Sequence, residues 1–340
     1  MNIKKLEHFL AENGQLKFRV RQIRQAIYQE GVSSFAEIST LSKELREQLE
    51  KELKVLSFDV EKILFSKDKK SAKALLKLSD GNLIETVLIS PLEDSWSVCV
   101  SSQVGCPLGC EFCSTGKMGF IRNLNAEEIT DQVLFWIQKL KTKNQKLSTI
   151  VYMGMGEPFL NWEEVSRSLR DLVDPKLFGF GARSLSVSTA GIPAGIEKMA
   201  REFPQVNLAL SLHFGTDEKR SAVMPINRQN NLEAIREALK KYFELSNRKV
   251  FLEYVMLAGI NDSQKDAEDL AKFVKSIGKL QLLHINLIRY NSTDTKFQPS
   301  SKEHTLQFKN YLLDQNLSVT IRKSLGEEIQ GACGQLAGKA

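Results

Sequence analysis

The sequence has 340 residues, 42% of them hydrophobic, and this length is sufficient to bury one large core and a small second one. It contains no apolar run long enough to cross a membrane, and residues 1–7 become polar before a signal peptide could form. We therefore expect a folded protein of the cytoplasm. The net charge is +6, with most of the excess in residues 1–80. A basic N-terminal quarter fits a surface that contacts phosphates, although a solvated, lysine-rich helix face gives the same composition.

The N-terminal part of the chain has the apolar spacing that is typical of amphipathic helices. The predicted helices span residues 4–12, 19–29 and 35–55. Ser34 and Glu37 have the spacing of a capping box in front of the last helix. Lys17, Arg19, Arg21 and Arg24 place a cluster of positive charge on this region. We expect a small helical, RNA-binding domain at residues 1–58.

A short β-rich region follows these helices. The predicted strands are Val60–Phe65, Ala72–Leu78 and Leu83–Ile89. Asp80-Gly81, between the last two strands, is a strong signal for a hairpin turn. We therefore expect a β-meander linker at residues 59–92, which joins the helical domain to the main body at residues 93–340.

In the main body, apolar β-rich runs alternate with amphipathic helices. The predicted strands are Val98–Ser101, Thr149–Met153, Ser184–Ser188, Val206–Leu212, Lys249–Met256, Leu282–Ile288 and Ser318–Ile321. The predicted helices lie near residues 126–141, 161–173, 193–202, 231–243, 263–277 and 302–315. Repeated βα units predict an α/β fold with parallel strands and outer helices, either a complete or a partial (β/α) barrel. A doubly wound open sheet is the alternative.

Three of the five cysteines lie within eight residues, at Cys106, Cys110 and Cys113. In a cytosolic chain such clustering indicates metal or redox chemistry rather than structural disulfides. Three thiolates at this C-x3-C-x2-C spacing can bind three irons of a cubane cluster and leave the fourth iron open to a cofactor or substrate. The alternative is a structural zinc site completed by one of the four histidines, none of which lies close in the sequence.

A second motif follows the predicted strand at residues 149–153, with the sequence Gly154-Met155-Gly156-Glu157-Pro158. Glycines allow the backbone to approach a ligand closely, and a glutamate can accept hydrogen bonds from an ammonium group. The alternative is an ordinary glycine-rich turn between a strand and a helix. The presence of the cysteine motif in the same chain favours a ligand-binding role.

The cysteine motif after the first strand of a βα barrel resembles the radical S-adenosylmethionine (SAM) superfamily. The resemblance implies a 4Fe–4S cluster on Cys106, Cys110 and Cys113, whose open iron binds SAM and cleaves it to a 5′-deoxyadenosyl radical. More narrowly, residues 85–340 resemble the RlmN and Cfr family of RNA adenosine methyltransferases, and the first 80 residues match more loosely. The matching motifs are residues 99–106, 153–158, 211–213, 224–227 and 331–336.

The family resemblance also implies functions for residues outside the cysteine motif. The SAM contacts that it implies are Gly156, Glu157, Ser188, Ser211, Leu212, His213 and Asn291. Glu85 aligns with a glutamate to which the family assigns a catalytic role as proton acceptor. Cys99 and Cys333 are the two remaining cysteines, and either one alone is more often a small buried apolar residue than a catalyst.

Carbons 2 and 8 of adenine are electron-poor and cannot attack the SAM methyl group directly, whereas a carbon radical can add to them. In the mechanism that the resemblance implies, Cys333 first takes a methyl group from one SAM, because a thiolate is a strong nucleophile. A second SAM generates the radical that removes hydrogen from this methyl group, and the product adds to the adenine. Cys99 then removes the ring proton and attacks the Cys333 sulfur, which leaves a Cys99–Cys333 disulfide that must be reduced.

The resemblance implies methylation of carbon 2 of an adenosine in 23S rRNA, at the peptidyl-transferase centre, and also of adenosine 37 in tRNA. The Cfr-type alternative is methylation of carbon 8 of the same rRNA adenosine. Residues 153–158 are similar to RlmN, whereas residues 287–291 are similar to Cfr. An electron donor such as flavodoxin is an expected partner. From another class, a noncatalytic Fe–S or zinc RNA-binding protein would also carry clustered cysteines.

Overall fold

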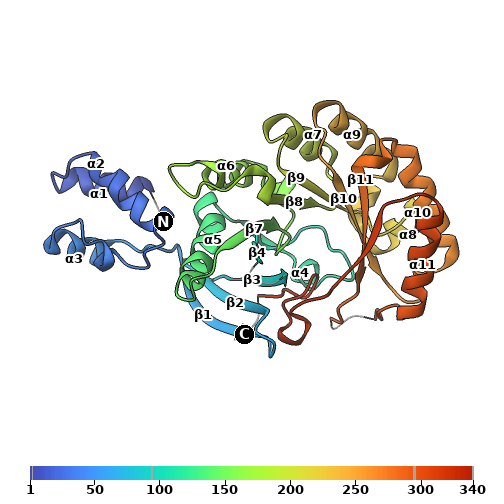
Figure 1. The fold of residues 1–340 in the computed structure, drawn as a ribbon, viewed down its shortest axis with the longest axis horizontal. Helices are drawn as coiled ribbons and strands as arrows, with labels where there is room; N and C mark the ends of the chain where they lie inside the picture. Colours follow the sequence, from blue (N-terminus) through green and yellow to red (C-terminus); the bar gives the residue numbers. More distant parts are fainter. Residues whose placement is uncertain (2, 93–94, 294–295, 339–340) are drawn as a thin grey trace.

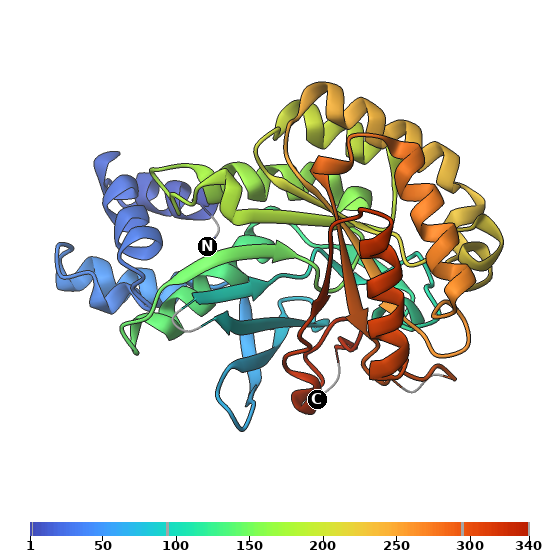
Figure 2. The same ribbon diagram turned by 45° about the vertical axis from the view of Figure 1, so that its right-hand side comes forward.

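A computed structural model describes all residues of the chain except 2, 93, 94, 294, 295, 339 and 340. Its central feature is a ten-stranded sheet that curves into an open, partial barrel (Figures 1 and 2). The strands, in their order across the sheet, are β1 (Phe58–Phe65), β2 (Ser71–Leu78), β3 (Leu83–Leu92), β4 (Ser95–Cys99), β7 (Leu147–Tyr152), β8 (Leu185–Thr189), β9 (Asn207–Ser211), β10 (Val250–Met256), β11 (Leu283–Arg289) and β12 (Val319–Arg322).

Neighbouring strands follow the order of the chain across the whole sheet. The first four pair antiparallel, and every pairing from β4 to β12 is parallel. The alternative of a doubly wound sheet is therefore wrong, because that fold requires the strand order to reverse. The expected α/β partial barrel is confirmed.

Helices cover the outer face of the parallel strands (Figure 1). They are α5 (Ala126–Lys141), α6 (Trp162–Val173), α7 (Pro193–Glu202), α8 (Asp217–Val223), α9 (Leu232–Leu245), α10 (Gln264–Ile277) and α11 (Lys302–Asp314). Asn125 and Glu128 form a capping box at the start of α5, which satisfies amide groups that the first helical turn leaves unpaired. Among the described residues, no helix is both long and apolar enough to span a membrane.

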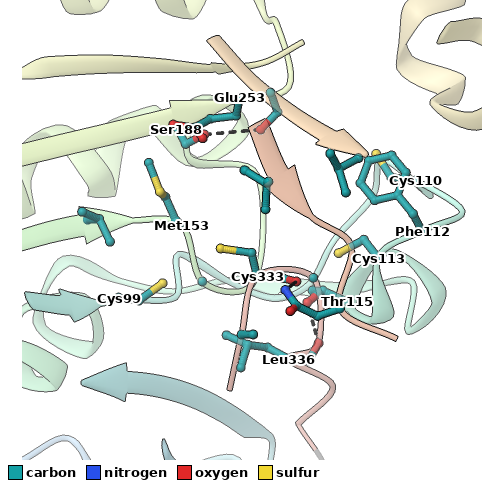
Figure 3. Close-up of a pocket in the computed structure, with 18 of the residues that line it drawn as sticks. Cys99, Cys110, Phe112, Cys113, Thr115, Met153, Ser188, Glu253, Cys333 and Leu336 are labelled. Carbon is teal, nitrogen blue, oxygen red and sulfur yellow. Dashed lines mark hydrogen bonds between the residues drawn. The ribbon is translucent and has the colours of Figure 1, made fainter. Parts of the chain in front are cut away.

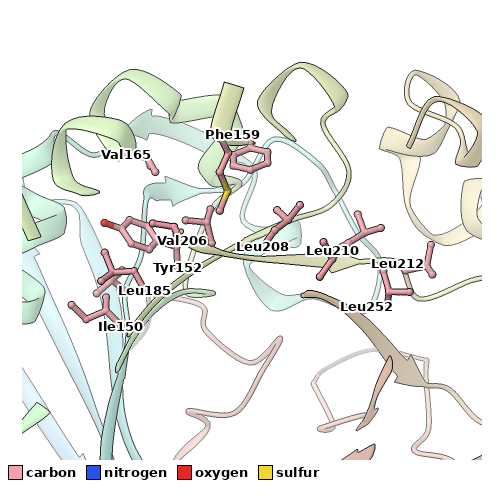
Figure 4. Packing of buried hydrophobic residues seen from close by; sticks show 14 of the residues in the cluster. Ile150, Tyr152, Phe159, Val165, Leu185, Val206, Leu208, Leu210, Leu212 and Leu252 are labelled. Carbon is pink, nitrogen blue, oxygen red and sulfur yellow. The ribbon is translucent and has the colours of Figure 1, made fainter. Parts of the chain in front are cut away.

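The main core lies between the sheet and these helices (Figure 4). Strand β8 shows how the sequence divides its two faces, because Leu185 and Val187 are fully buried in this core. Successive side chains of a strand point to opposite faces, so Ser186 and Ser188 face the interior of the barrel. Full burial of each aliphatic side chain contributes about 1.5–3 kcal/mol. The same alternation that builds the core therefore places polar groups inside the barrel.

The N-terminal helices form a second, smaller core of their own. They are α1 (Ile3–Glu12), α2 (Phe18–Arg24) with a π-turn at Gln25–Gln29, a 3-10 turn at Phe35–Glu37, and α3 (Lys43–Glu52). The predicted continuous helix at 35–55 is wrong. Ser34 and Glu37 do form the expected capping box, but the backbone leaves helical geometry at Ile38, and Ser42 caps a new helix. Leu134 of α5 also packs into this small core, so the N-terminal helices rest on the barrel.

The β-meander is not a separate layer, because β3 pairs with β4 and thereby extends the barrel sheet. The expected domain boundary at residue 93 lies outside the described residues. Two short elements near the cysteines were not predicted: a hairpin of β5 (Gln103–Gly105) and β6 (Phe120–Asn123), and the one-turn helix α4 (Ser114–Lys117). They are too short to give a periodic sequence signal.

Candidate active site

A cavity of about 250 Å³ opens at the carboxyl ends of the parallel strands, under the C-terminal segment (Figure 3). All five cysteines line this cavity. Six of the seven expected SAM contacts line it as well: Gly156, Glu157, Ser188, Ser211, His213 and Asn291. Residues from distant parts of the sequence therefore meet at one place, at the strand ends where ligands bind in α/β proteins.

The loop after β5 presents Cys106, Cys110 and Cys113 to the cavity, and Cys113 is the residue before α4. Burial raises the pKa of Cys106 to about 12 and also raises that of Cys110, so iron would have to displace their protons. Among the described residues, no three His, Cys, Asp or Glu side chains converge as the ligands of a single ion would. A cubane does not need this convergence, because each thiolate binds a different iron. The three thiols and the adjoining cavity fit a cluster with one open iron.

Glu157 lies buried beside the cysteine loop. Its carboxylate accepts hydrogen bonds from the backbone amides of Ala190, at 2.7 Å, and Phe159, at 3.2 Å. Burial nevertheless dominates and raises the pKa of Glu157 to about 7. A carboxylate that is held in place and becomes charged as the pH rises through about 7 is suited to accept a hydrogen bond from an amino group.

His213 presents a ring of fixed orientation to the same cavity. Its Nδ1 accepts a hydrogen bond from the Val255 amide at 3.1 Å, and the ring packs edge-on against Phe112. Burial and the charge of Arg220 lower the pKa of His213 to about 3. The ring is therefore neutral with its proton on Nε2, which makes this nitrogen a hydrogen-bond donor.

The glycines of the 154–158 motif also allow a close approach of two backbone segments, which the sequence did not indicate. A Cβ on Gly154 would lie 2.6 Å from the Val100 carbonyl oxygen, and one on Gly156 would lie 2.6 Å from Gln103 Cβ. The space that these glycines leave is thus filled by the segment between Cys99 and Cys106. Close approach of two backbone segments, in addition to any ligand, requires glycine here.

Cys99 and Cys333 face the cavity from different elements, and Cys333 lies between Cys99 and Cys113 in Figure 3. Cys99 ends β4, whereas Cys333 lies in the C-terminal segment and is exposed to the cavity. Burial raises the pKa of both thiols, that of Cys99 to about 12. All five cysteines are free, so the expected disulfide is not present in this structure.

Comparisons with known proteins agree with this geometry. A sequence model of the radical SAM superfamily matches residues 100–274, and one of the ribosomal RNA large subunit methyltransferase N-terminal domain matches residues 1–55. A Clostridium botulinum (Loch Maree) protein named ribosomal RNA large subunit methyltransferase Cfr is 42% identical over 324 residues, covering 94% of this chain and 92% of its own. A Geobacter sulfurreducens protein named dual-specificity RNA methyltransferase RlmN is 40% identical over 340 residues, covering 100% and 91%.

The chain belongs to the RlmN and Cfr family of radical SAM RNA methyltransferases. The crystal structure of a radical SAM methyltransferase from Sphaerobacter thermophilus has the same fold, with a TM-score of 0.93 and 37% identity over 100% of this chain and 98% of that one. Membership of the radical SAM superfamily implies a 4Fe–4S cluster and SAM as cofactors.

Two of the site residues that the family resemblance implies do not line the cavity. Leu212 is fully buried in the main core, so only its backbone is near the site. Glu85 is 1% exposed and is not among the residues that line the cavity. Both of its carboxylate oxygens are engaged, one by Lys73 and the other by backbone amides of the C-terminal segment.

No sequence motif indicated Arg220, a fully buried cation that organises the site. Its guanidinium donates to the carbonyl oxygens of Ala190, at 2.6 Å, and Leu212, at 3.0 Å, and to Asn227 Oδ1 at 2.7 Å. It thereby joins the loops after β8 and β9 to helix α8.

Two further charged residues were also missed, Glu253 on β10 and Arg322 on β12, which both line the cavity. Their side chains form an ion pair at 3.4 Å. The charge of Arg322 lowers the pKa of Cys333 against the larger, opposite effect of burial. A cation near a thiol favours its nucleophilic, ionised form.

Proposed function

We propose that the protein methylates carbon 2 of an adenosine in 23S rRNA, at the peptidyl-transferase centre, and adenosine 37 of tRNA. The observation that carries this proposal is that Cys99 and Cys333 open into the same cavity as the three cysteines of the cluster motif. A radical SAM enzyme that only cleaves SAM does not need two further thiols there. Two thiols are what a methyl carrier and a resolving residue require.

In this proposal Cys333 is the methyl carrier. Its thiolate attacks the methyl group of a first SAM and becomes S-methylcysteine, with S-adenosylhomocysteine as the second product. Exposure to the cavity gives the sulfur access to a ligand, and Arg322 supports its ionised form.

Cys99 is the proposed base and resolving thiol. After the carbon derived from the Cys333 methyl group has bonded to the adenine, the adduct would return one electron to the cluster, and Cys99 removes the ring proton. Cys99 passes this proton to solvent and attacks the Cys333 sulfur as a thiolate. The electron pair of the carbon–sulfur bond goes to the carbon, which takes up a proton to complete the methyl group, and a Cys99–Cys333 disulfide remains for reduction. Cys99 ends strand β4, whereas Cys333 lies on a segment without regular secondary structure, and both thiols line the same cavity.

The proposed ligands of the cluster are Cys106, Cys110 and Cys113. When bound, the cluster and a second SAM supply the radical that activates the methyl group on Cys333. Glu157 and His213 would accept from and donate to polar groups of SAM, and Ser188, Ser211, Gly156 and Asn291 would border it. The proposal assigns only one cluster to the chain, so the electron that cleaves SAM must come from an external donor such as flavodoxin.

Residues 1–58 are the proposed RNA-binding domain, with residues 59–92 as a linker and 93–340 as the catalytic domain. The match of residues 1–55 to an N-terminal domain of rRNA methyltransferases supports this division. Lys17 and Arg21 are exposed on this unit, where they can contact phosphates.

The second candidate function is methylation of carbon 8, because relatives named Cfr match the chain as well as those named RlmN do. The test is to incubate the reconstituted enzyme, SAM and a reductant with a 23S rRNA fragment or a tRNA, and to identify the nucleoside by mass spectrometry against 2-methyl- and 8-methyladenosine. We expect 2-methyladenosine from both RNAs. 8-Methyladenosine would establish the second candidate. An intact cluster without any SAM cleavage would instead indicate a noncatalytic RNA-binding protein.

A further inference from the structure

The segment that carries Cys333 has almost no regular secondary structure, yet hydrogen bonds fix it on several sides. The amide of Ser114 donates to the Gly334 carbonyl at 2.8 Å, and the Thr115 hydroxyl donates to the Leu336 carbonyl at 2.6 Å (Figure 3). Both donors belong to α4, directly after the cysteine motif. The Asn291 amide reaches the Cys333 carbonyl at 3.3 Å from the end of β11. The position of Cys333 therefore depends on backbone contacts rather than on a helix or strand.

Glu85 provides an anchor from the opposite side, on β3 of the meander. Its Oε2 accepts hydrogen bonds from the backbone amides of Ala337, at 2.7 Å, and Gly338, at 3.2 Å. Its Oε1 forms an ion pair with Lys73 Nζ at 2.7 Å. Lys73 is on the neighbouring strand β2, where it pairs with Val87 of β3. Val87 is two residues after Glu85, so Lys73 is the diagonal cross-strand neighbour of Glu85.

The Lys73–Glu85 ion pair is buried, and this burial explains how it stabilises the C-terminal segment. The side chains of Lys73 and Glu85 are 7% and 1% exposed, and buried charges are costly unless every polar atom is paired. Lys73 satisfies only one of the two carboxylate oxygens. If residues 337–338 moved away, the other oxygen would remain buried without these partners. The carboxylate therefore favours the docked position of the C-terminal segment.

We propose that Lys73 and Glu85 form a clamp, with Glu85 as a positioning residue that holds residues 331–338 against the cavity and so places the Cys333 thiol. This inference rests on the proposed role of Cys333 as methyl carrier. It assigns to Glu85 a function through the backbone of the segment, in place of the proton transfer that the family resemblance implies. A hydrogen bond to an ionised acceptor is stronger than one between neutral groups, which suits a segment without other regular structure.

The test measures the position of the segment independently of methyl transfer. In the reconstituted holoenzyme, Glu85→Ala should increase hydrogen exchange of the peptide that covers residues 331–338, and alkylation of Cys333 by N-ethylmaleimide, each about tenfold. Single-turnover methylation of Cys333 by SAM should fall about tenfold, with unchanged iron content. Glu61→Ala is the matched control. Glu61 forms an ion pair at 3.7 Å with Lys77, which is on the same strand, β2, as Lys73, but this pair is exposed. This variant should leave all three measurements as in the wild type.

A second variant keeps the test decisive if Glu85→Ala does not fold. Ala337→Pro removes one of the two donated N–H groups and leaves the buried ion pair intact, so it should release the segment in the same way. Wild-type exchange and alkylation in either folded variant would overturn the clamp. If the variants release the segment but the wild type never carries a methyl group on Cys333, the proposed function fails while the clamp stands. If Glu85→Ala lost methyl transfer while residues 331–338 stayed protected from exchange and alkylation, Glu85 would have a direct catalytic function and the clamp would be contradicted.

Discussion

At the scale of single residues, burial sets the chemistry of the site more than local charge does. Glu157 has a pKa of about 7 although backbone amides donate to it, because removal from water favours the neutral acid. His213 is held neutral for the same reason, with the additional effect of Arg220. Both groups are thus poised for hydrogen bonding to a polar ligand, one as an acceptor near neutral pH and the other as a donor.

The pKa of Glu157 predicts the pH dependence of SAM binding. Folding raises this pKa from its ordinary value of 4.5 to about 7, so the neutral acid stabilises the folded state below pH 4.5, and this contribution is lost as the pH rises through 7. Binding should show the opposite trend if Glu157 holds SAM as proposed, since only its carboxylate form would accept well from the SAM amino group. We expect SAM affinity of the holoenzyme, measured by calorimetry, to rise between pH 6 and pH 8. Glu157→Gln should bind about tenfold more weakly at pH 8, a loss of about 1.4 kcal/mol, with a flatter profile. A variant that kept the wild-type profile would exclude this role.

At the scale of elements, the loops at the strand ends depend on polar cross-links that bury charge. Arg220 of α8 holds the loops after β8 and β9 by donating hydrogen bonds to the carbonyl oxygens of Ala190, Ser211 and Leu212 and to Asn227 Oδ1. An unpaired buried acceptor costs about 1–3 kcal/mol. The arrangement of Ser188, Ser211 and His213 is therefore coupled to a helix that does not itself carry a predicted site residue.

This coupling predicts a large loss of stability in Arg220→Met, which keeps the apolar stem but removes the guanidinium donor from several buried acceptors. We expect the free energy of unfolding, from urea titration monitored by circular dichroism, to fall by about 3–5 kcal/mol. Arg201→Met is the control, because Arg201 forms an ion pair on the exposed face of α7 and should cost less than about 0.5 kcal/mol. Equal stability of the two variants would show that the Arg220 network does not hold these loops.

The sequence predicted elements well wherever the period of apolar residues extended over several turns or a whole strand. Helix α5 has the predicted bounds and the predicted capping box, because Asn125 and Glu128 act locally. The prediction of one helix at 35–55 was wrong because helix propensity alone cannot locate the break at Ile38. A new helix begins after Ser42, which caps it. The cysteine motif identified the cavity, but contacts between distant segments, such as Glu85 with Ala337, have no local sequence signal.

At the scale of the whole molecule, a small helical unit with its own core rests on α5, at the end of the molecule opposite α10 and α11 (Figure 1). Its exposed cations, Lys17 and Arg21, are available for RNA phosphates. A substrate that contacts both the helical unit and the cavity must be extended or large. RNA fits this requirement better than a free nucleoside does.

Phosphate contacts by this unit predict a salt-dependent effect on RNA binding. Lys17→Ala/Arg21→Ala should weaken binding of a 23S rRNA fragment about tenfold at low salt, and should lower the slope of affinity against salt by about one to two. Lys272→Ala/Lys302→Ala removes the same charge from exposed positions on α10 and α11 and is the control. Equal salt slopes for the two double variants would argue against RNA contact through the helical unit.

The central claim is that Cys333 carries the methyl group and Cys99 releases the product, and the Cys99→Ala variant tests it most directly. This variant should still be methylated on Cys333 and bond to the RNA, but it can neither remove the ring proton nor attack the Cys333 sulfur. A denaturing gel with labelled RNA should therefore show a covalent protein–RNA complex that is absent from the Cys99→Ala/Cys333→Ala double variant. Normal turnover by Cys99→Ala, or no complex despite a methylated Cys333, would contradict the account.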